Sequence, residues 1–297
     1  MFKRILVPLD GSKLAELALP YAEELAGALS SEIAVIFVCD VAHCQHRYEH
    51  QVYVDRIAQQ VGAHIEEKGA KTTVKPVVLD GHPATAIIDY ADKNDISLIV
   101  MTTHGRSGIM PWAMGSIASK VLYGVNIPVL LVRASVPAPA GGKEGQILNR
   151  ILVPLDGSEV GEAALPSVRE LAEKLKVEVS LFQVIPPGQH VHTVGGLNYF
   201  LFSEQQVESM KARAKQYLEG VSGRFTGTRA TVRSELKLGD PAAEIIKFAA
   251  ETDISLVAMA THGYSGNKQW TFGSVTHKVL HSGNTPLLLV RAPEAKV

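Results

Sequence analysis

The chain has 297 residues, of which 46% are hydrophobic and 20% are charged, a balance typical of ordinary globular proteins. Its 29 Lys and Arg residues nearly match its 30 Asp and Glu residues, so no overall charge attracts nucleic acid or an anionic membrane. Two cysteines exclude a disulfide framework and fit a reducing compartment. No apolar run approaches the roughly 20 residues that span a bilayer, and Asp10 interrupts the N-terminal one too early for a signal peptide. We therefore expect a cytoplasmic protein.

The sequence contains a long internal repeat. "RILVPLDGS" occurs at residues 4–12 and again, unaltered, at residues 150–158, and the matches continue downstream in the same order. Such identity indicates a duplication. The join is rich in Pro, Ala and Gly, which predicts an exposed linker. We expect one domain at residues 1–134, a linker at 135–148 and a second domain at 149–297.

Within each copy, short apolar runs alternate with segments of helical period. In the first copy the runs that predict strands are residues 5–9, 33–38, 74–79, 98–102 and 129–132. Continuous apolar runs are typical of strands buried on both faces of a parallel sheet. Pro20 and Pro166 fall inside the first helical segment and predict a kink or break there. The order βαβαβαβαβ predicts two tandem doubly wound α/β domains, each with a five-stranded parallel sheet flanked by helices.

A histidine-rich segment, "HCQHRYEH", follows the second strand at residues 43–50. His46, Glu49 and His50 fit the H-x-x-E-H pattern of inverted zinc proteases, and the two histidines would share a helix face. We favour a solvated polar helix start. Adventitious or regulatory metal binding through His43, His46, Glu49 and His50 stays open as an alternative.

Three elements should meet at the carboxyl edge of each sheet, where doubly wound folds bind ligands. Asp10 ends the first strand, "TTHG" ends the fourth, and Gly-Ser at residues 115–116 opens the last helix. A glycine turn beside a helix N-terminus offers backbone N–H groups, a hydroxyl and a positive dipole end, which favour phosphate. The competing explanation is an ordinary loop with Ser116 capping the helix. The recurrence of the whole set in the second copy favours the phosphate site.

The combination of "ILVPLDGS", "TTHG" followed by nine residues and "GS", and "IPVLLV" resembles the universal stress protein family in its tandem form. The resemblance covers nearly the whole chain. It implies Rossmann-like domains, similar to adenine nucleotide alpha hydrolases, with strand order 3-2-1-4-5. It also implies that the last strands, at residues 127–133 and 285–291, pair as a dimer-like unit within one chain. Further pairing into a homodimer stays open.

The resemblance further implies that Asp10 and Asp156 meet the adenosine part of ATP, that the backbones of Val38 and Val184 meet adenine, and that the glycine loops hold the phosphates. The positions implied for cofactor binding are Asp10, Val38, Met101, Thr102, Gly105, Gly115, Ser116 and Ile117 in the first copy, and Asp156, Val184, Met259, Ala260, Gly263, Gly273, Ser274 and Val275 in the second. Thr102 and Ala260 stand where the family pattern has glycine. Since glycine allows the closest approach and positive φ, we expect altered or weakened binding.

Three functions are compatible with the sequence. We expect a stress-response or signalling module whose occupancy by ATP, or by AMP or ADP, changes conformation or association with protein partners, without a catalytic residue. A slow ATP hydrolase would need Mg²⁺ and a positioned water, and no carboxylate beyond Asp10 is placed to serve. A scaffold that has lost nucleotide would use residues 186–206 to hold an apolar ligand. For that segment we favour an ordinary surface loop followed by an amphipathic helix.

Overall fold

The computed structural model describes residues 1–40, 47–105, 114–133, 146–193, 196–263 and 272–292. They form two compact units. Unit 1 comprises Met1–Asn149 with Asn284–Arg291, and unit 2 comprises Arg150–Gly283 with Ala292–Val297. Most of the linker predicted at 135–148 lies outside the described residues. No described helix is long and apolar enough to cross a membrane.

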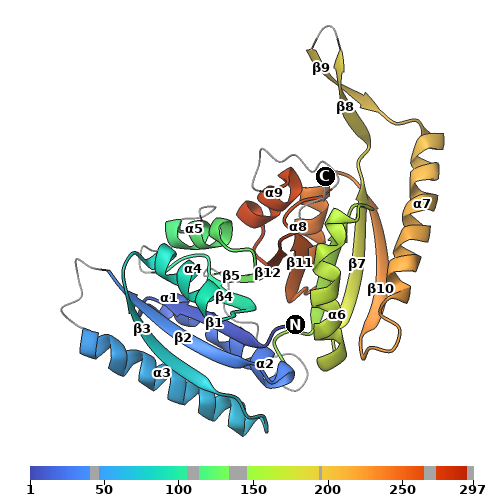
Figure 1. Cartoon of the computed structure of the whole chain (residues 1–297). Helices are drawn as coiled ribbons and strands as arrows, with labels where there is room; N and C mark the ends of the chain where they lie inside the picture. The colour runs from blue at the N-terminus through green and yellow to red at the C-terminus, as the bar shows by residue number, and fades with distance from the viewer. Residues whose placement is uncertain (41–46, 106–113, 134–145, 194–195, 264–271, 293–297) are drawn as a thin grey trace. The chain divides into compact units, whose positions relative to one another are not determined.

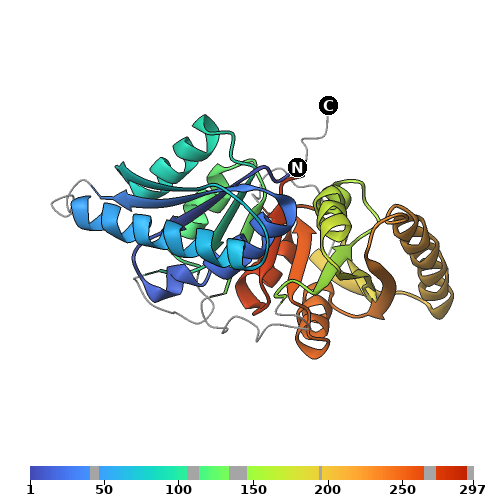
Figure 2. The same cartoon turned by 90° about the horizontal axis from the view of Figure 1, so that it is seen from below.

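Unit 1 has a parallel sheet with helices on both faces (Figures 1 and 2). Its elements are β1 (Arg4–Leu9), α1 (Lys13–Glu16), α2 (Leu19–Leu29), β2 (Glu32–Cys39), α3 (Arg47–Glu67), β3 (Val74–Asp80), α4 (Pro83–Lys93), β4 (Leu98–Thr102), α5 (Ser116–Gly124) and β5 (Val129–Val132). The strands follow the order β3-β2-β1-β4-β5 and all pair in parallel. This order confirms the predicted 3-2-1-4-5 topology.

Unit 2 repeats this arrangement with an insertion. Its elements are β6 (Arg150–Leu155), η3 (Val160–Ala164), α6 (Leu165–Lys174), β7 (Glu178–Ile185), β8 (Gly188–Thr193), β9 (Gly196–Leu201), α7 (Glu204–Gly223), β10 (Thr231–Leu238), α8 (Pro241–Glu251), β11 (Leu256–Ala260) and α9 (Ser274–Ser282). Its parallel strands follow the order β10-β7-β6-β11. The last strand of the second copy, β12 (Leu287–Val290), belongs to unit 1 because it pairs antiparallel with β5. The two final strands therefore pair, as predicted.

Local sequence explains these elements. Every residue of β4, β5 and β12 is buried, as their continuous apolar runs predict. The proline in each first helical segment breaks it in two. Pro20 lies in the first turn of α2 and Pro166 in the first turn of α6, where the N–H that proline lacks would have no helical partner.

Residues 186–206 are not the surface loop that we expected. They contain β8 and β9, which form an antiparallel hairpin in register from Gly188 opposite Leu201 to Thr193 opposite Gly196. The hairpin projects from unit 2 between the end of β7 and the start of α7 (Figure 1). Two consecutive glycines between short runs rich in β-formers are a sequence signal for such a hairpin.

Glu24 on α2 ties the chain ahead of β6 to unit 1. Its carboxylate accepts hydrogen bonds from the backbone N–H groups of Ile147 (2.5 Å) and Leu148 (2.8 Å). Burial raises the pKa of Glu24, and these two hydrogen bonds act in the opposite direction. We expect Glu24→Ala to lower the free energy of unfolding by about 1–3 kcal/mol in urea titrations, because two N–H groups lose their acceptor.

The control for this change is Glu66→Ala, which removes an exposed carboxylate from α3. It should change the free energy of unfolding by less than about 0.5 kcal/mol. Equal effects of the two substitutions would show that the Glu24 hydrogen bonds contribute nothing to stability.

Candidate functional sites

A short turn after β1 positions the Asp10 carboxylate, the first of the groups expected to contact a ligand. Asp10 Oδ1 accepts a hydrogen bond from the Ser12 N–H at 2.9 Å. Gly11 between them has φ 82°, a conformation that favours glycine. Ser12 Oγ in turn accepts from the Ala15 N–H at 3.1 Å and caps α1. "DGS" therefore encodes a turn that fixes the aspartate at the strand end.

The second copy builds the same turn after β6. Asp156 Oδ1 accepts from the Ser158 N–H at 3.0 Å and from its hydroxyl at 2.6 Å. Gly157 has φ 83°, matching the first copy. Ser158 Oγ accepts from the Gly161 N–H at 3.0 Å. The aspartate is thus fixed by local hydrogen bonds in both units.

The glycine of each Thr-His-Gly turn lies against this aspartate. A Cβ atom on Gly105 would lie 2.1 Å from Asp10 Oδ2, and one on Gly263 would lie 2.2 Å from Asp156 Oδ2. Any side chain at these two positions would collide with the carboxylate. The turn glycine is therefore required by close approach, and its contact joins the ends of the first and fourth strands of each copy.

Each last helix begins at the same edge with a glycine N-cap. The Gly115 N–H donates to the Thr103 carbonyl at 2.8 Å, and the Gly273 N–H donates to the Thr261 carbonyl at 2.9 Å. Neither N-cap makes a side-chain capping bond, since glycine has no side chain. Ser116 is the first helical residue rather than the N-cap, so the explanation that it caps the helix is wrong. The first-turn N–H groups and the positive dipole end can serve an anion; the turn glycine and helix start together are called the anion site below.

Thr102 and Ala260 stand where the family pattern has glycine. They end β4 and β11, and their exposed fractions are only 6% and 4%. Neither has a positive φ. The Thr102 hydroxyl donates to the His104 carbonyl at 2.6 Å within its own turn. The conformational reason for expecting weaker binding therefore does not apply at either position, and only the steric reason remains.

Each unit has a cavity at the carboxyl ends of its strands, and this cavity is lined by all the predicted positions of that copy. The cavity of unit 1 has a volume of about 410 Å³ and is lined by Asp10, Val38, Met101, Thr102, Gly105, Gly115, Ser116 and Ile117, among others. The cavity of unit 2 has a volume of about 280 Å³ and is lined by Asp156, Val184, Met259, Ala260, Gly263, Gly273, Ser274 and Val275, among others. The sequence motifs thus converge in space in both copies.

The cavity of unit 1 also has polar lining that the sequence did not predict. Asp40, just after β2, lines it together with Cys39, so the expectation that Asp10 is the only carboxylate there is wrong. His50 in the first turn of α3 lines it too and stacks on Phe37 with ring centroids 4.1 Å apart. In a doubly wound sheet, the carboxyl end of each strand lies at the edge where ligands bind. The position of Asp40 directly after the second strand is therefore the signal that could have identified it.

The metal alternative gains no support from the described residues, which contain no group of three His, Cys, Asp or Glu side chains that could hold a metal ion. His43 and His46 lie outside the described residues. Glu49 and His50 are in the first turn of α3, and His50 turns toward Phe37 and the cavity.

The wall of the cavity of unit 2 includes an aromatic side chain. Phe182 lines it and packs against Phe248 with ring centroids 4.7 Å apart. The equivalent residue in the first copy is Ile36, as the matching registers of the two sheets show. Unlike Phe182, Ile36 is not among the described residues that line the cavity of its own unit.

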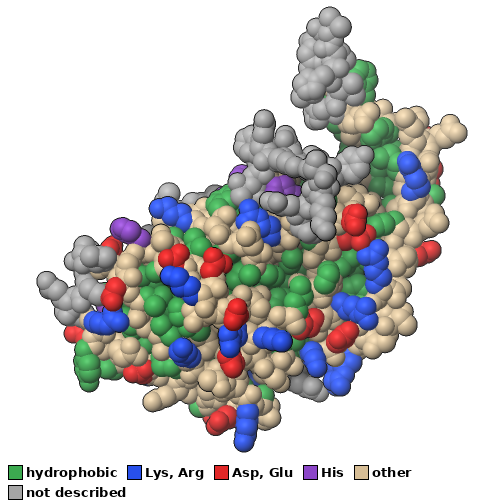
Figure 3. All heavy atoms as spheres, viewed as in Figure 1, with side chains coloured by type: hydrophobic (Ala, Val, Ile, Leu, Met, Phe, Trp, Pro, Cys, Tyr) green, Lys and Arg blue, Asp and Glu red, His purple; other side chains and the backbone are tan. Residues whose placement is uncertain are grey.

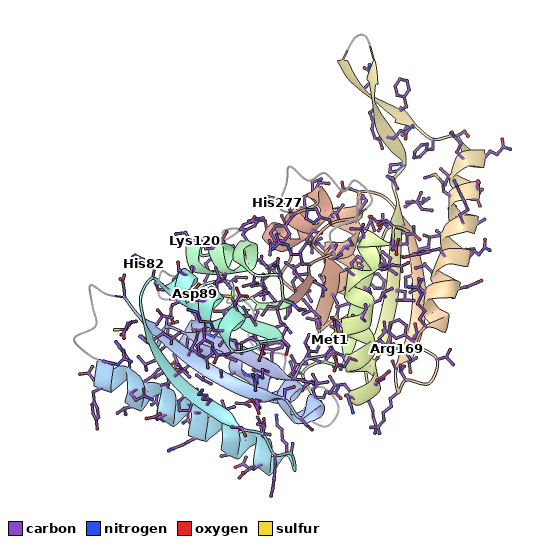
Figure 4. The ribbon with its side chains drawn as sticks, in the orientation of Figure 1. Met1, His82, Asp89, Lys120, Arg169 and His277 are labelled. Carbon is purple, nitrogen blue, oxygen red and sulfur yellow. The ribbon has the colours of Figure 1, made fainter. Side chains whose placement is uncertain are left out.

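The two anion sites also differ in the charge beside them. Lys278 lies one helical turn after Ser274 and forms an ion pair with Asp240, the N-cap of α8, at 3.4 Å. Lys120 is its counterpart on α5, and His82 replaces the aspartate as N-cap of α4 (Figure 4). Among the described residues, no ion pair includes Lys120. In the part of the chain that the structure describes, the lysine beside the anion site of unit 1 is therefore not held in an ion pair like that of Lys278.

A doubly wound sheet with a cavity at its carboxyl strand ends, bordered by a glycine turn and a helix N-terminus, defines the class of doubly wound α/β proteins, in which ligands bind at the topological switch point. The model of the universal stress protein family matches residues 1–133 and 148–291. The chain belongs to the universal stress protein family, in its tandem form.

Individual relatives agree with this assignment. The universal stress protein YxiE of Bacillus subtilis is 29% identical over 150 residues, which cover 49% of this chain and 100% of that protein. Universal stress protein Slr1230 of Synechocystis is 23% identical over 320 residues, covering 97% of this chain and 100% of that protein. The crystal structure of a universal stress protein from Archaeoglobus fulgidus covers 98% of this chain and 99% of its own, with TM-score 0.67 and 19% identity. That likeness shows a shared two-domain fold.

The contact between the turn glycine and the aspartate predicts energetic coupling. Gly105→Ala should lower the free energy of unfolding by about 1–3 kcal/mol, because its Cβ would displace the Asp10 carboxylate. In an Asp10→Ala background the same substitution should cost much less, which a double-mutant cycle of urea titrations measures.

Gly62→Ala is the matched control, because a Cβ at this α3 position meets nothing within 4 Å. It should be neutral or stabilising by up to about 1 kcal/mol. A Gly105→Ala cost that is unchanged by Asp10→Ala would contradict the coupling.

Proposed function

We propose that this chain is an adenine-nucleotide-binding module of a stress-response or signalling pathway, with one nucleotide site in each unit. The observation that carries the proposal is the cavity of unit 1, where a fixed carboxylate, an apolar wall and an anion site converge within about 410 Å³. Cavities that hold small-molecule ligands measure roughly 300–1,000 Å³. The residues present therefore suit a mononucleotide in size and in chemistry.

Each part of the cavity has a matching part of the ligand. Val38, Ile87 and Met101 offer an apolar surface for the base. Asp10 is a hydrogen-bond acceptor suited to ribose hydroxyls. Gly115 and Ser116 bring the N-terminus of α5, whose N–H groups and dipole favour the phosphates. This division follows the roles that the family resemblance implies.

The two sites should differ in affinity, with the tighter one in unit 1. The cavity of unit 2 is smaller, about 280 Å³, and Phe182 forms part of its wall. Its lysine is neutralised by Asp240, whereas Lys120 is available to a phosphate. Lysine and serine one turn apart lie on the same helix face, and helical side chains lean toward the N-terminus. Lys120 therefore lies within reach of a phosphate chain held at Ser116.

Occupancy would act by linking elements that are separate in the chain. A nucleotide in the cavity of unit 1 would contact the ends of β1, β2 and β4 and the start of α5 at once. A ligand that binds one arrangement of these elements better than another shifts the population toward it. Changed conformation or changed association with protein partners is the expected output.

Slow hydrolysis is the second candidate function, and Asp40 is the observation that favours it. Asp10 and Asp40 place two carboxylates in the lining of the cavity of unit 1, and carboxylate oxygens are preferred ligands of Mg²⁺. Unit 2 has Pro186 at the position that follows its second strand, so hydrolysis would be confined to unit 1. Release of phosphate from ATP with Mg²⁺, abolished by Asp40→Asn, would identify it.

Nucleotide binding is tested first by denaturing the purified protein and identifying any released nucleotide, and then by calorimetric titration with ATP. Asp10→Ala should weaken the tighter site at least about 10-fold, a loss of about 1.4 kcal/mol, and Asp156→Ala should affect only the weaker site. Asp89→Ala, an exposed change on α4, should leave both unchanged. The absence of any released nucleotide, with no heat from millimolar ATP, would overturn the proposal.

Lys120→Gln should separate phosphate recognition from base recognition. We expect it to weaken ATP binding about 2- to 5-fold, as the loss of an exposed charge pair does, and to leave adenosine binding unchanged. Raised salt should diminish the same difference. Lys278→Gln is the matched control, since its ammonium is already paired with Asp240. Equal effects of the two substitutions on ATP would contradict the proposed asymmetry.

A further inference from the structure

The β8–β9 hairpin, residues 188–201, is the one feature of unit 2 that the nucleotide sites do not use, and it is called the hairpin arm below. None of the side chains that the structure describes in the arm lines either cavity. The arm arises from the longer segment that only the second copy has after its second strand. It projects away from the sheet of unit 2 (Figure 1). Any function of the arm therefore depends on the side chains and backbone groups that it exposes.

The described part of the arm is apolar and exposed. Tyr199 is 48% exposed, Phe200 is 51% exposed and Leu201 is 74% exposed. Leu238, also exposed, ends β10 opposite Ile185, directly beside the root of the arm. Figure 3 shows this hydrophobic surface on the described part of the hairpin. Consecutive large apolar side chains at the surface are a mark of an interaction site.

The root of the arm is held in place at both ends. Pro186 and Pro187 precede it, and proline restricts the backbone. The Phe202 N–H donates to the Pro187 carbonyl at 3.0 Å. Ser203 then forms a reciprocal capping box with Gln206 at the start of α7. A rooted arm loses little conformational freedom when it binds, which favours association.

The arm has no charge that would prevent identical strands from pairing. Residues 186–203 contain no Asp, Glu, Lys or Arg. Natural edge strands usually carry charges, Pro or bulges that block edge-to-edge pairing. In the described residues β8 and β9 form a two-stranded sheet, so each strand has an outer edge whose backbone groups can accept another strand. An isolated two-stranded hairpin is only marginally stable in water, and further strands would stabilise it.

We propose that the hairpin arm is a homodimerisation element, and that its partner is the hairpin arm of a second copy of this chain. The outer edge of β9 pairs antiparallel with β9 of the second copy across a twofold axis, giving a four-stranded sheet. Two identical strands satisfy each other in this arrangement. Tyr199, Phe200 and Leu201 supply the apolar contact, and the absence of Asp, Glu, Lys and Arg leaves His190 and His192 as the only basic side chains of the arm.

The size of the hairpin arm determines the affinity that we expect for the dimer. Standard interfaces use roughly 20–30 residues from each partner, and the hairpin arm is smaller than that. The dimer should therefore have a dissociation constant in the micromolar range and exchange with monomer during sedimentation.

The test is sedimentation velocity of the full chain from about 1 to 200 µM, a range that brackets micromolar dissociation. We expect the wild type to show reversible dimerisation. Replacement of residues 188–201 by two glycines should give a monomer throughout. The flanks are already hydrogen-bonded through Phe202 and Pro187, so a two-residue turn can close them.

A second variant guards against misfolding of the shortened chain. Tyr199→Lys with Leu201→Lys places two like charges on one face of β9 and should raise the dissociation constant at least about 10-fold. Tyr48→Lys on α3 is the matched control, since it changes a tyrosine that is 82% exposed outside the arm, and it should leave dimerisation unchanged. Unaltered circular dichroism and melting temperature would show that the variants fold.

Three results would overturn the proposal. The first is a wild type that stays monomeric at every concentration. The second is a dimer that persists both in the shortened chain and in the double lysine variant. The third is a loss of dimer in Tyr48→Lys equal to that in the double lysine variant. Because none of these readouts involves nucleotide, they are independent of the nucleotide-binding proposal.

Discussion

The contact between the first-strand aspartate and the turn glycine after the fourth strand is the constraint on which both sites depend. In each copy a Cβ on that glycine would fall within about 2 Å of the carboxylate oxygen, at 2.1 Å from Asp10 and 2.2 Å from Asp156. A larger residue in place of the glycine would displace the carboxylate from this position. The Asp-Gly-Ser turn holds it with a hydrogen bond to the next serine N–H. The same contact fixes the turn glycine after the fourth strand. Because the anion site consists of this glycine and the start of the last helix, it depends on the same contact.

The two copies preserve this framework and differ at positions in or beside the two cavities. A tyrosine hydroxyl donates to a glutamate just after the Asp-Gly-Ser turn in both, from Tyr53 to Glu16 at 3.1 Å and from Tyr217 to Glu162 at 2.9 Å. By contrast, the cavity wall and the charge beside the helix start have changed between the copies. A duplicated fold can keep its packing while its two sites diverge, since function resides in the site rather than in the fold. Divergence at these positions is the physical reason to expect unequal affinities.

Much of this architecture could be predicted because buried parallel strands have continuous apolar sequences, and because carboxyl strand ends converge. That geometry brought all sixteen predicted positions into two cavities. The features that the sequence did not predict correctly also have physical explanations. The competing explanation, that Ser116 caps the last helix, rests on the strong capping preference of serine, but Gly115 is the N-cap. Asp40 follows a strand with no motif around it. The hairpin arm was missed because two consecutive glycines indicate a flexible loop as readily as a tight turn.

The position of the hairpin arm gives the two proposals a common structural element. Val184 near the end of β7 lines the cavity of unit 2, and the chain enters the root of the arm at Pro186, two residues later. A ligand that fixes the end of β7 would also fix the direction in which the arm leaves the sheet. By thermodynamic linkage, any factor by which nucleotide changes dimerisation is the factor by which dimerisation changes nucleotide affinity. An insertion at this strand end, unlike one at the opposite edge of the sheet, lies next to the cavity of unit 2, so the proposed dimerisation and the proposed nucleotide site share one structural element.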